Sequence, residues 1–252
     1  MLETSLLCAF AFLAGFVDAI AGGGGLIQVP ALFAFFPSAP PAILLGTNKL
    51  VAVTGTTLAT LRYLWSVPVS WKQVVPAMTI SGVAAMGGAK TVMLLNPGAA
   101  RPILLVLLIA MVAYALVRPA LGQSDGSTEK LPSALLYLTA ALFGFYDGFF
   151  GPGAGSVLMF VLARFFGYGF LRAAATTKLL NLSSNFCSLL LFLATGNVLY
   201  LVALPMAACN VVGGFTGAHL AVRLGNRFIR WIFMIVCLAL IAKLVADLYR
   251  GG

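Results

Sequence analysis

The sequence predicts an all-α integral membrane protein made of two inverted repeats, and three observations support this fold class. The chain has 252 residues, of which 62% are hydrophobic and 8% charged, whereas soluble domains carry roughly 25% charged residues. Its mean hydropathy is +1.06, and apolar stretches of about 20 residues, each able to cross a bilayer, recur along its length. The second half repeats the first at a constant offset of 129 positions. We therefore expect one helical membrane bundle without a sizeable soluble domain.

Each repeat is predicted to contain a helical hairpin followed by three transmembrane helices. The first repeat covers residues 1–118 and the second covers 133–252, with a polar cytoplasmic linker at 119–132 between them. The first apolar segment has no basic region ahead of it and no clear cleavage site, so we interpret it as mature protein. The expected elements are hairpin 4–36 with helices 43–64, 73–95 and 102–117, and hairpin 133–167 with helices 173–195, 199–221 and 231–248.

Glycines interrupt each hairpin inside an apolar run. In the first hairpin, residues 4–20 would form a helix of 17 residues, about 26 Å long, and residues 26–36 one of 11 residues, about 17 Å long. Together these arms are too short for two comfortable spans and too long for one. Hydrocarbon tolerates broken backbone only where protein or a water-filled cavity covers it. We therefore expect re-entrant or short-span hairpins whose glycine tips lie inside the membrane.

Scarce charged residues indicate the duplication more strongly than the common glycines and leucines do. At the offset of 129 positions, Asp18 aligns with Asp147 and Lys49 aligns with Lys178. Glycines, a proline and an arginine align at the same offset without a gap. Chance alignment of rare charged residues is improbable in this composition, so the sequence indicates an internal repeat.

The distribution of basic residues predicts that the two repeats are inverted. The linkers 37–42 and 196–199 carry no charge, so the positive-inside rule puts the basic linkers in the cytoplasm. The second hairpin must then leave and return on the same side, and three further crossings invert the copy, with both termini outside. The rival interpretation, in which each broken segment is one tilted span, fits the charge pattern less well. The basic linkers are 62–72, 118–130, 164–172 and 223–230.

The glycine tips are the first candidate binding groups. A run of glycines lets the backbone approach a ligand closely, and the arm after each tip exposes N–H groups and a helix dipole that favour an anion. Two opposed tips near the midplane are typical of inverted-repeat transporters built from discontinuous helices. The alternative is that the glycines only permit tight packing or a turn. The candidate residues are Gly22, Gly23, Gly24, Gly25, Gly151, Gly153, Gly155 and Ser156.

Two lysines open the helices that follow the hairpins, and they are the second set of candidates. A buried ammonium costs several kcal/mol unless it is paired or hydrated, so a repeated one indicates function. The alternative is that each lysine reaches the headgroups from a helix end. Helical spacing places the two asparagines of the second half on the face of its lysine. The candidate substrate-binding residues here are Asn48, Lys49, Thr177, Lys178, Asn181 and Asn185.

Asp18 and Asp147 each precede a glycine tip by four positions. They could pair with the two lysines, hold the hairpin structure, or take up protons that couple to transport. Structural pairing is the interpretation that we favour from the sequence.

Several function classes find no support in the residues. The net charge is +9, but the basic residues lie between apolar spans, which indicates a role in topology and attraction for anions rather than nucleic-acid binding. The four cysteines lie in apolar segments without the spacing of a disulfide framework or zinc site, and there is one histidine. We therefore expect no cofactor, no metal and no enzyme activity. A structural or partner-binding membrane subunit remains an alternative.

The motifs resemble one known family. Segment 15–25 (GFVDAIAGGGG), segment 46–49 (GTNK) and the degenerate copy at 151–153 (GPG) are similar to the TauE/SafE family of sulfite and sulfonate exporters. The resemblance covers essentially the full chain, and its first motif is the more specific one. It implies a bacterial cytoplasmic-membrane protein that moves sulfite, sulfonates or sulfoacetate, usually outward.

The residues agree with that implication in kind but do not fix the substrate. A small anion is the expected partner besides the lipid bilayer, with protons as a possible coupling ion and alternating access between the two tips as the mechanism. An anion channel, or a transporter of small carboxylates without sulfur, stays open as an alternative. The sequence does not predict an oligomeric state.

Overall fold

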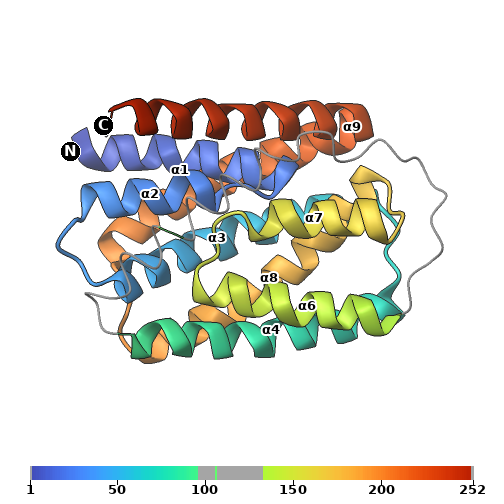
Figure 1. Cartoon of the computed structure of the whole chain (residues 1–252), viewed down its shortest axis with the longest axis horizontal. Coiled ribbons are helices and arrows are strands. Elements are labelled where there is room, and N and C mark those ends of the chain that lie inside the picture. Colours follow the sequence, from blue (N-terminus) through green and yellow to red (C-terminus); the bar gives the residue numbers. More distant parts are fainter. Residues whose placement is uncertain (1, 96–105, 107–132, 251–252) are drawn as a thin grey trace.

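The structure, a computed structural model, describes residues 2–95, 106 and 133–250, and every secondary-structure element in these ranges is an α-helix. Figure 1 shows the helices packed as one bundle. The predicted all-helical fold is confirmed. The predicted helix 102–117 and the linker 119–132 lie outside the described residues. The helices are α1 (Leu2–Ala21), α2 (Gly25–Phe35), α3 (Pro41–Leu64), α4 (Trp71–Leu94), α6 (Ser133–Phe149), α7 (Ala154–Phe165), α8 (Phe170–Ala194) and α9 (Tyr200–Arg250).

Five of the described helices are long and apolar enough to cross a membrane: Glu3–Ala21 in α1, all of α3, α4 and α8, and Tyr200–Gly225 in α9. The helices α2, α6 and α7 are shorter apolar helices. Both predicted hairpins are therefore helix–break–helix units, formed by α1 with α2 and by α6 with α7. In Figure 1 the short arms α2 and α7 extend from the middle of the molecule toward opposite ends.

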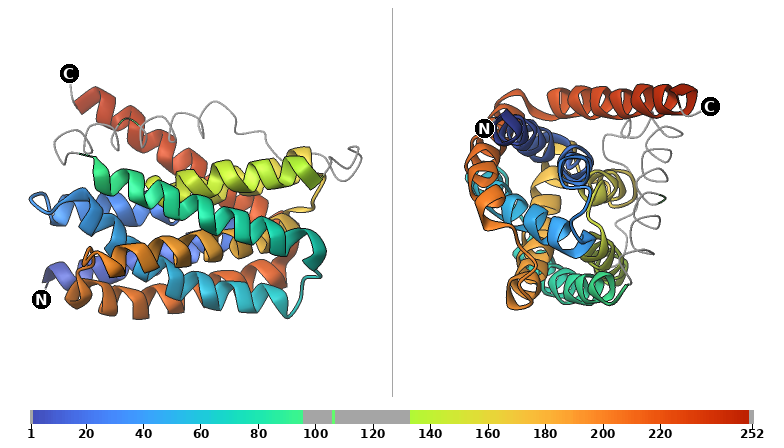
Figure 2. Two further views of the ribbon diagram at one scale, coloured as in Figure 1. Left: turned by 90° about the horizontal axis from the view of Figure 1, so that it is seen from below. Right: turned by 90° about the vertical axis from the view of Figure 1, so that its left-hand side faces the viewer.

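The break in α9 separates the last two predicted helices. Gly225 has φ 72° and ψ −163°, which is not helical. Such positive φ is readily available to glycine because it lacks a Cβ atom. Beyond this residue the chain turns back along the molecule, as Figures 1 and 2 show. The first part of α9 corresponds to the predicted helix 199–221 and the second part to the predicted helix 231–248.

Close helix packing repeats at the offset of 129 positions. α1 packs along α9, and α6 packs along α4, which occupy equivalent places in the two halves. A Cβ atom on Gly217 would collide with the backbone of Phe16, and one on Gly88 would collide with the backbone of Phe145. Membrane helices pack through such small residues because the bilayer gives them no hydrophobic driving force to associate. The same contact is thus made twice, by residues 129 positions apart.

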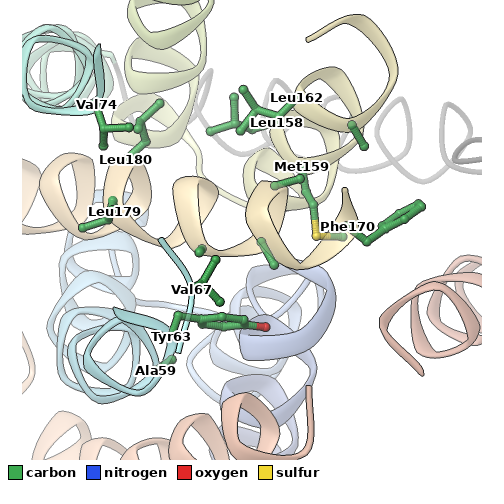
Figure 3. Packing of buried hydrophobic residues seen from close by; sticks show 14 of the residues in the cluster. Ala59, Tyr63, Val67, Val74, Leu158, Met159, Leu162, Phe170, Leu179 and Leu180 are labelled. Carbon is green, nitrogen blue, oxygen red and sulfur yellow. The ribbon is translucent and has the colours of Figure 1, made fainter. Parts of the chain in front are cut away.

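Among the residues whose side chains the structure describes, two apolar clusters make up the core, and each contains residues of one short arm. The α7 cluster contains Leu158 and Met159 of α7, packed with Tyr63 of α3 and residues of α8. Figure 3 shows these three side chains with other members of the cluster. The α2 cluster contains Val29 and Leu32 of α2. Further members of the α2 cluster are Leu7, Leu44, Leu45, Val51, Phe192 and Met206.

Several residues of one cluster have their equivalent, 129 positions away, in the other cluster. Leu7 of the α2 cluster corresponds to Leu136 of the α7 cluster, and Val51 corresponds to Leu180. Along α3 the α2-cluster residues come first and Tyr63 of the α7 cluster comes near the end. The apolar core is therefore divided into two layers along the long helices. Polar contacts lie between these layers, as described below.

The loops divide between the two ends of the bundle. In Figure 1 the loops at 36–40 and 195–199 lie at the end where α1 begins and α9 finishes, whereas the loops at 65–70 and 166–169 lie at the opposite end. The predicted topology likewise places the uncharged linkers on one side of the membrane and the basic linkers on the other. Which end faces the cytoplasm stays a prediction.

Candidate functional site

The two glycine tips touch each other between the apolar clusters. Gly22 has φ 73° and Gly151 has φ 95°, so both breaks use backbone conformations that favour glycine. A Cβ atom on Gly22 would collide with the backbone of Gly155, which lies at the other tip. The hydroxyl of Ser156 donates a 2.8 Å hydrogen bond to the carbonyl of Ala21. The breaks therefore meet at one place rather than forming two separate sites.

Lys49 of α3 is fully engaged by residues of the other half. Its ammonium donates to the backbone carbonyl of Asp147 at 2.5 Å and to the side-chain oxygen of Asn185 at 2.7 Å. The same ammonium lies 3.0 Å from the Asp147 carboxylate. The hydroxyl of Ser184 donates to the second oxygen of that carboxylate. Because an ammonium has three donors, these contacts use all of them.

Lys178 of α8 makes the reciprocal contact. Its ammonium lies 2.5 Å from the carboxylate of Asp18 at the end of α1. Each ion pair thus joins a residue before position 95 to one after position 133. The two pairs correspond at the offset of 129 positions, because Lys178 is the equivalent of Lys49 and Asp147 is the equivalent of Asp18. The Asp18 side chain retains 24% of its accessible surface and the Asp147 side chain 8%. The second pair is therefore the more accessible one.

A cavity of about 40 Å³ lies at the meeting point of the tips, which is room for about three water-sized spheres. Along α3 its lining residues Asn48, Ala52 and Thr56 lie between Leu45 of the α2 cluster and Tyr63 of the α7 cluster. Its charged lining groups are the two aspartates. The full lining is Ala14, Asp18, Gly22, Gly24, Gly25, Gln28, Asn48, Ala52, Thr56, Asp147, Gly151, Gly155, Asn181, Asn185 and Asn210.

Most of the residues singled out from the sequence come together here. Those that do not line the cavity are Gly23, Lys49, Gly153, Ser156, Thr177 and Lys178. Both lysines are 1% exposed, and they reach the cavity through their aspartate partners. Thr177 is buried, and its hydroxyl has no hydrogen-bond partner among the described residues.

Gln28 and Asn210 line the cavity, although sequence reasoning missed them. Each is an amide inside an apolar helix, and a polar residue within a membrane segment is by itself a reason to consider function. That signal was present in the sequence. It was obscured because neither amide is repeated at the offset of 129 positions: the equivalent residues are Val157 and Ser81.

The described residues contain no group of three or more His, Cys, Asp or Glu side chains that could hold a metal ion. What the site offers is backbone at two helix starts, amide side chains and two ion pairs. Of these groups, the N–H donors at helix starts are known to bind small anions in other proteins, membrane transporters included.

Comparison with known proteins places the chain in a family. Residues 7–244 match the model of the family described as sulfite exporter TauE/SafE. The chain belongs to the TauE/SafE family. The match spans both tips, both ion pairs and most of the part of α9 beyond Gly225. The chain is thus a multi-pass membrane transporter of the TauE/SafE family.

Curated members of the TauE/SafE family cover nearly the whole chain. The probable membrane transporter protein ORF9 of Sinorhizobium sp is 37% identical over 96% of this chain and 92% of its own length. The probable membrane transporter protein YfcA of Escherichia coli K12 is 37% identical over 94% of this chain and 87% of its own. A probable membrane transporter protein of Haemophilus influenzae is 35% identical over 96% of this chain and 94% of its own. No solved structure matches the chain significantly.

Proposed function

We propose that this TauE/SafE protein moves a small sulfur-containing anion, such as sulfite or a sulfonate, across the bacterial cytoplasmic membrane by alternating access. The observation that carries the proposal is the cavity at the two touching tips, with two lysine–aspartate pairs beside it that each join the first half of the chain to the second, and with an apolar cluster on either side. A polar cavity between two apolar layers is the arrangement that exposes a ligand to one side at a time. The family description supports outward transport of sulfite.

The inverted repeat belongs to this proposal. It is supported by the exchange of the two ion pairs, of the helix contacts and of the cluster members at one offset. In alternating access, the α2 cluster and the α7 cluster open in turn while the tips stay near the midplane. The two repeats then exchange conformations, which costs little when their packing is equivalent.

The charges beside the cavity favour movement of the anion together with a proton. Two lysines and two aspartates cancel, so a bound anion adds an uncompensated negative charge to a poorly solvated place. A proton from water that joins the Asp18 carboxylate removes one negative charge and releases the Lys178 ammonium toward the anion. When the anion leaves, the proton leaves too and the ion pair forms again. Net flux then follows the combined gradients of anion and proton.

Asp18 suits this role better than Asp147. Among the described residues, Lys178 is the hydrogen-bond donor to the Asp18 carboxylate, and that side chain keeps the larger exposed fraction. The Asp147 carboxylate is held by both Lys49 and Ser184. We assign Asp18 to proton coupling and Asp147 to structure.

The test is efflux of methanesulfonate from proteoliposomes that contain a pH-sensitive dye. Methanesulfonate is the anion of a strong acid, so it stays ionised and does not cross the bilayer as a neutral molecule. The wild type should show saturable efflux with alkalinisation of the lumen. The variant Asp18→Asn should lose the alkalinisation, whereas Lys72→Met, which removes an exposed lysine at the start of α4, should behave as the wild type.

Other outcomes separate the alternatives. Efflux that does not saturate and moves charge without protons identifies an anion channel. Efflux of short carboxylates but not of sulfite or sulfonates overturns the substrate class. Absence of flux for every anion tested overturns transport through this cavity, and proton-coupled efflux by Asp18→Asn overturns the role of Asp18.

A further inference from the structure

Two amide side chains that take no part in the ion pairs line the cavity together. Gln28 of α2 and Asn210 of α9 lie 182 positions apart in the chain, and the Asn210 Nδ2 lies 3.3 Å from the Gln28 Oε1. Gln28 retains 2% of its accessible surface. Its Nε2 has no hydrogen-bond partner among the residues that the structure describes. A buried amide donor without an acceptor is costly, so this one calls for a ligand that supplies the acceptor.

The hydrogen-bond network fixes which way the Gln28 amide faces. The Asn210 Nδ2 also donates a 2.8 Å hydrogen bond to the backbone carbonyl of Ala11, which can only accept. The Asn210 amide cannot be turned round without losing that bond. The Gln28 atom beside its Nδ2 must therefore be the oxygen, which leaves the Gln28 NH₂ group as the donor in the cavity wall.

Two glycines hold Asn210 in this position. A Cβ atom on Gly15 of α1 would lie 3.0 Å from the Asn210 side-chain carbon Cγ, and one on Gly55 of α3 would lie 2.9 Å from it. Any other residue at either position would displace the asparagine. Helices α1, α3 and α9 thus form a slot for one amide, and a group held by packing on rigid helices is already positioned before a ligand arrives.

The amide pair, which joins Gln28 of the first repeat to Asn210 of the second, has no counterpart at the offset of 129 positions. The positions 129 residues from Gln28 and Asn210 hold Val157 and Ser81, and the position equivalent to Gly55 holds Ser184. The ion pair and the glycine tip, by contrast, each have a counterpart at this offset. The amide pair is therefore not required by the repeated architecture, and it gives one side of a pseudo-symmetric cavity a donor that the other side lacks.

We propose that Gln28, oriented by Asn210, is a substrate-binding residue that donates to one oxygen of the transported anion and sets its selectivity. This inference rests on the proposed anion transport. The helix start at Gly24 and Gly25 lies in the same cavity wall and offers further N–H donors and a favourable dipole. These donors on one side of the cavity favour an oxyanion that presents an acceptor oxygen to them, such as a sulfonate.

The test compares methanesulfonate binding to wild-type and variant protein in nanodiscs, by calorimetry. Gln28→Met keeps a similar volume and removes the donor. It should weaken binding by about ten- to a hundred-fold, the range expected for one hydrogen bond to a charged group. Its melting temperature should stay the same or rise, because an unsatisfied buried group is lost. Gln28→Glu, which replaces the donor by an acceptor of equal size, should weaken binding further.

Matched controls and a second variant complete the experiment. Gln73→Met removes a half-buried glutamine that bonds Ser133 away from the cavity, and it should bind as the wild type does. Asn210→Ser introduces the residue found at the equivalent position of the other repeat. It keeps Gln28 but lets the Gln28 amide turn, so binding should lose part of its affinity. This result would support the inference even if Gln28→Met fails to fold. Wild-type affinity in either cavity variant overturns this inference alone. A wild type that binds no anion overturns the proposed function with it.

Discussion

Lys178 of α8 pairs with Asp18 of α1 across 160 positions of sequence, and Lys49 of α3 pairs with Asp147 of α6 in the reciprocal way. The two pairs consist of residues that correspond at the offset of 129 positions, but their surroundings differ. The Lys49 pair is closed by Asn185 and Ser184. The Lys178 pair has more accessible surface on its carboxylate. We propose that the Lys49 pair has a structural role and the Lys178 pair a role in transport, and this difference can be tested.

The first prediction concerns the stability of the closed pair. Asp147→Asn leaves the Lys49 ammonium buried without its countercharge, and breaking one partner of a buried pair costs about 3–5 kcal/mol. We expect the free energy of unfolding in mixed micelles to fall by that order. The double variant Asp147→Asn with Lys49→Met should recover most of the loss, because it removes the isolated charge. Equal stability of the single variant and the wild type would contradict a structural role.

The second prediction concerns the working pair. Lys178→Met removes the ammonium that we expect to turn toward the anion, so methanesulfonate flux should fall by about ten- to a hundred-fold. The exposed Lys72 provides the matched control, and Lys72→Met should leave the flux unchanged. The measurement is initial efflux from proteoliposomes with equal protein content. Wild-type flux through Lys178→Met would show that the lysine serves structure alone.

The third prediction separates backbone strain from contact between the tips. Gly22 and Gly196 have similar φ values, 73° and 70°. A Cβ atom on Gly196 meets nothing within 4 Å, whereas one on Gly22 runs into the backbone of Gly155. Gly196→Ala should therefore cost about 1 kcal/mol from strain alone. Gly22→Ala should cost about 2–5 kcal/mol, because strain and overpacking add.

Melting curves and flux measurements on the two glycine variants test whether contact between the tips is needed for stability and transport. Gly196→Ala should transport at the wild-type rate, and Gly22→Ala should lose transport because the second tip is displaced from the cavity. Similar behaviour of both variants would mean that the tips do not need to touch.

The fourth prediction concerns orientation in the membrane. On a cysteine-free background, Ser38→Cys lies between α2 and α3, and Ser66→Cys lies between α3 and α4. The positive-inside rule puts the first outside and the second in the cytoplasm. A membrane-impermeant maleimide should label Ser38→Cys in whole cells and Ser66→Cys only after lysis. Thr195→Cys should be labelled like Ser38→Cys, since the predicted inversion of the second repeat returns the chain to the outer face there. The opposite labelling pattern would reverse the topology.

Local patterns were enough to predict much of this protein. The helices, the glycine breaks and the internal repeat follow from apolar periodicity, from residues that cannot continue a helix, and from a single offset that aligns scarce charges. Asp18, Lys49, Asp147 and Lys178 could be found because each is expensive in a membrane and each occurs in a matched place. Family membership follows from the same motifs and is confirmed by the comparisons.

Tertiary structure alone decided which of these groups meet. Nothing in the sequence says that Lys178 faces Asp18 rather than Asp147, because the choice depends on how α1 and α8 pack, 160 positions apart. The same holds for Gln28, which becomes a cavity donor only when α9 brings Asn210 against it between two glycines. The amino-acid composition of a segment determines whether it can be buried in the membrane. The partner of a buried polar group is chosen by the packing of distant helices, and in this protein that packing assembled the site.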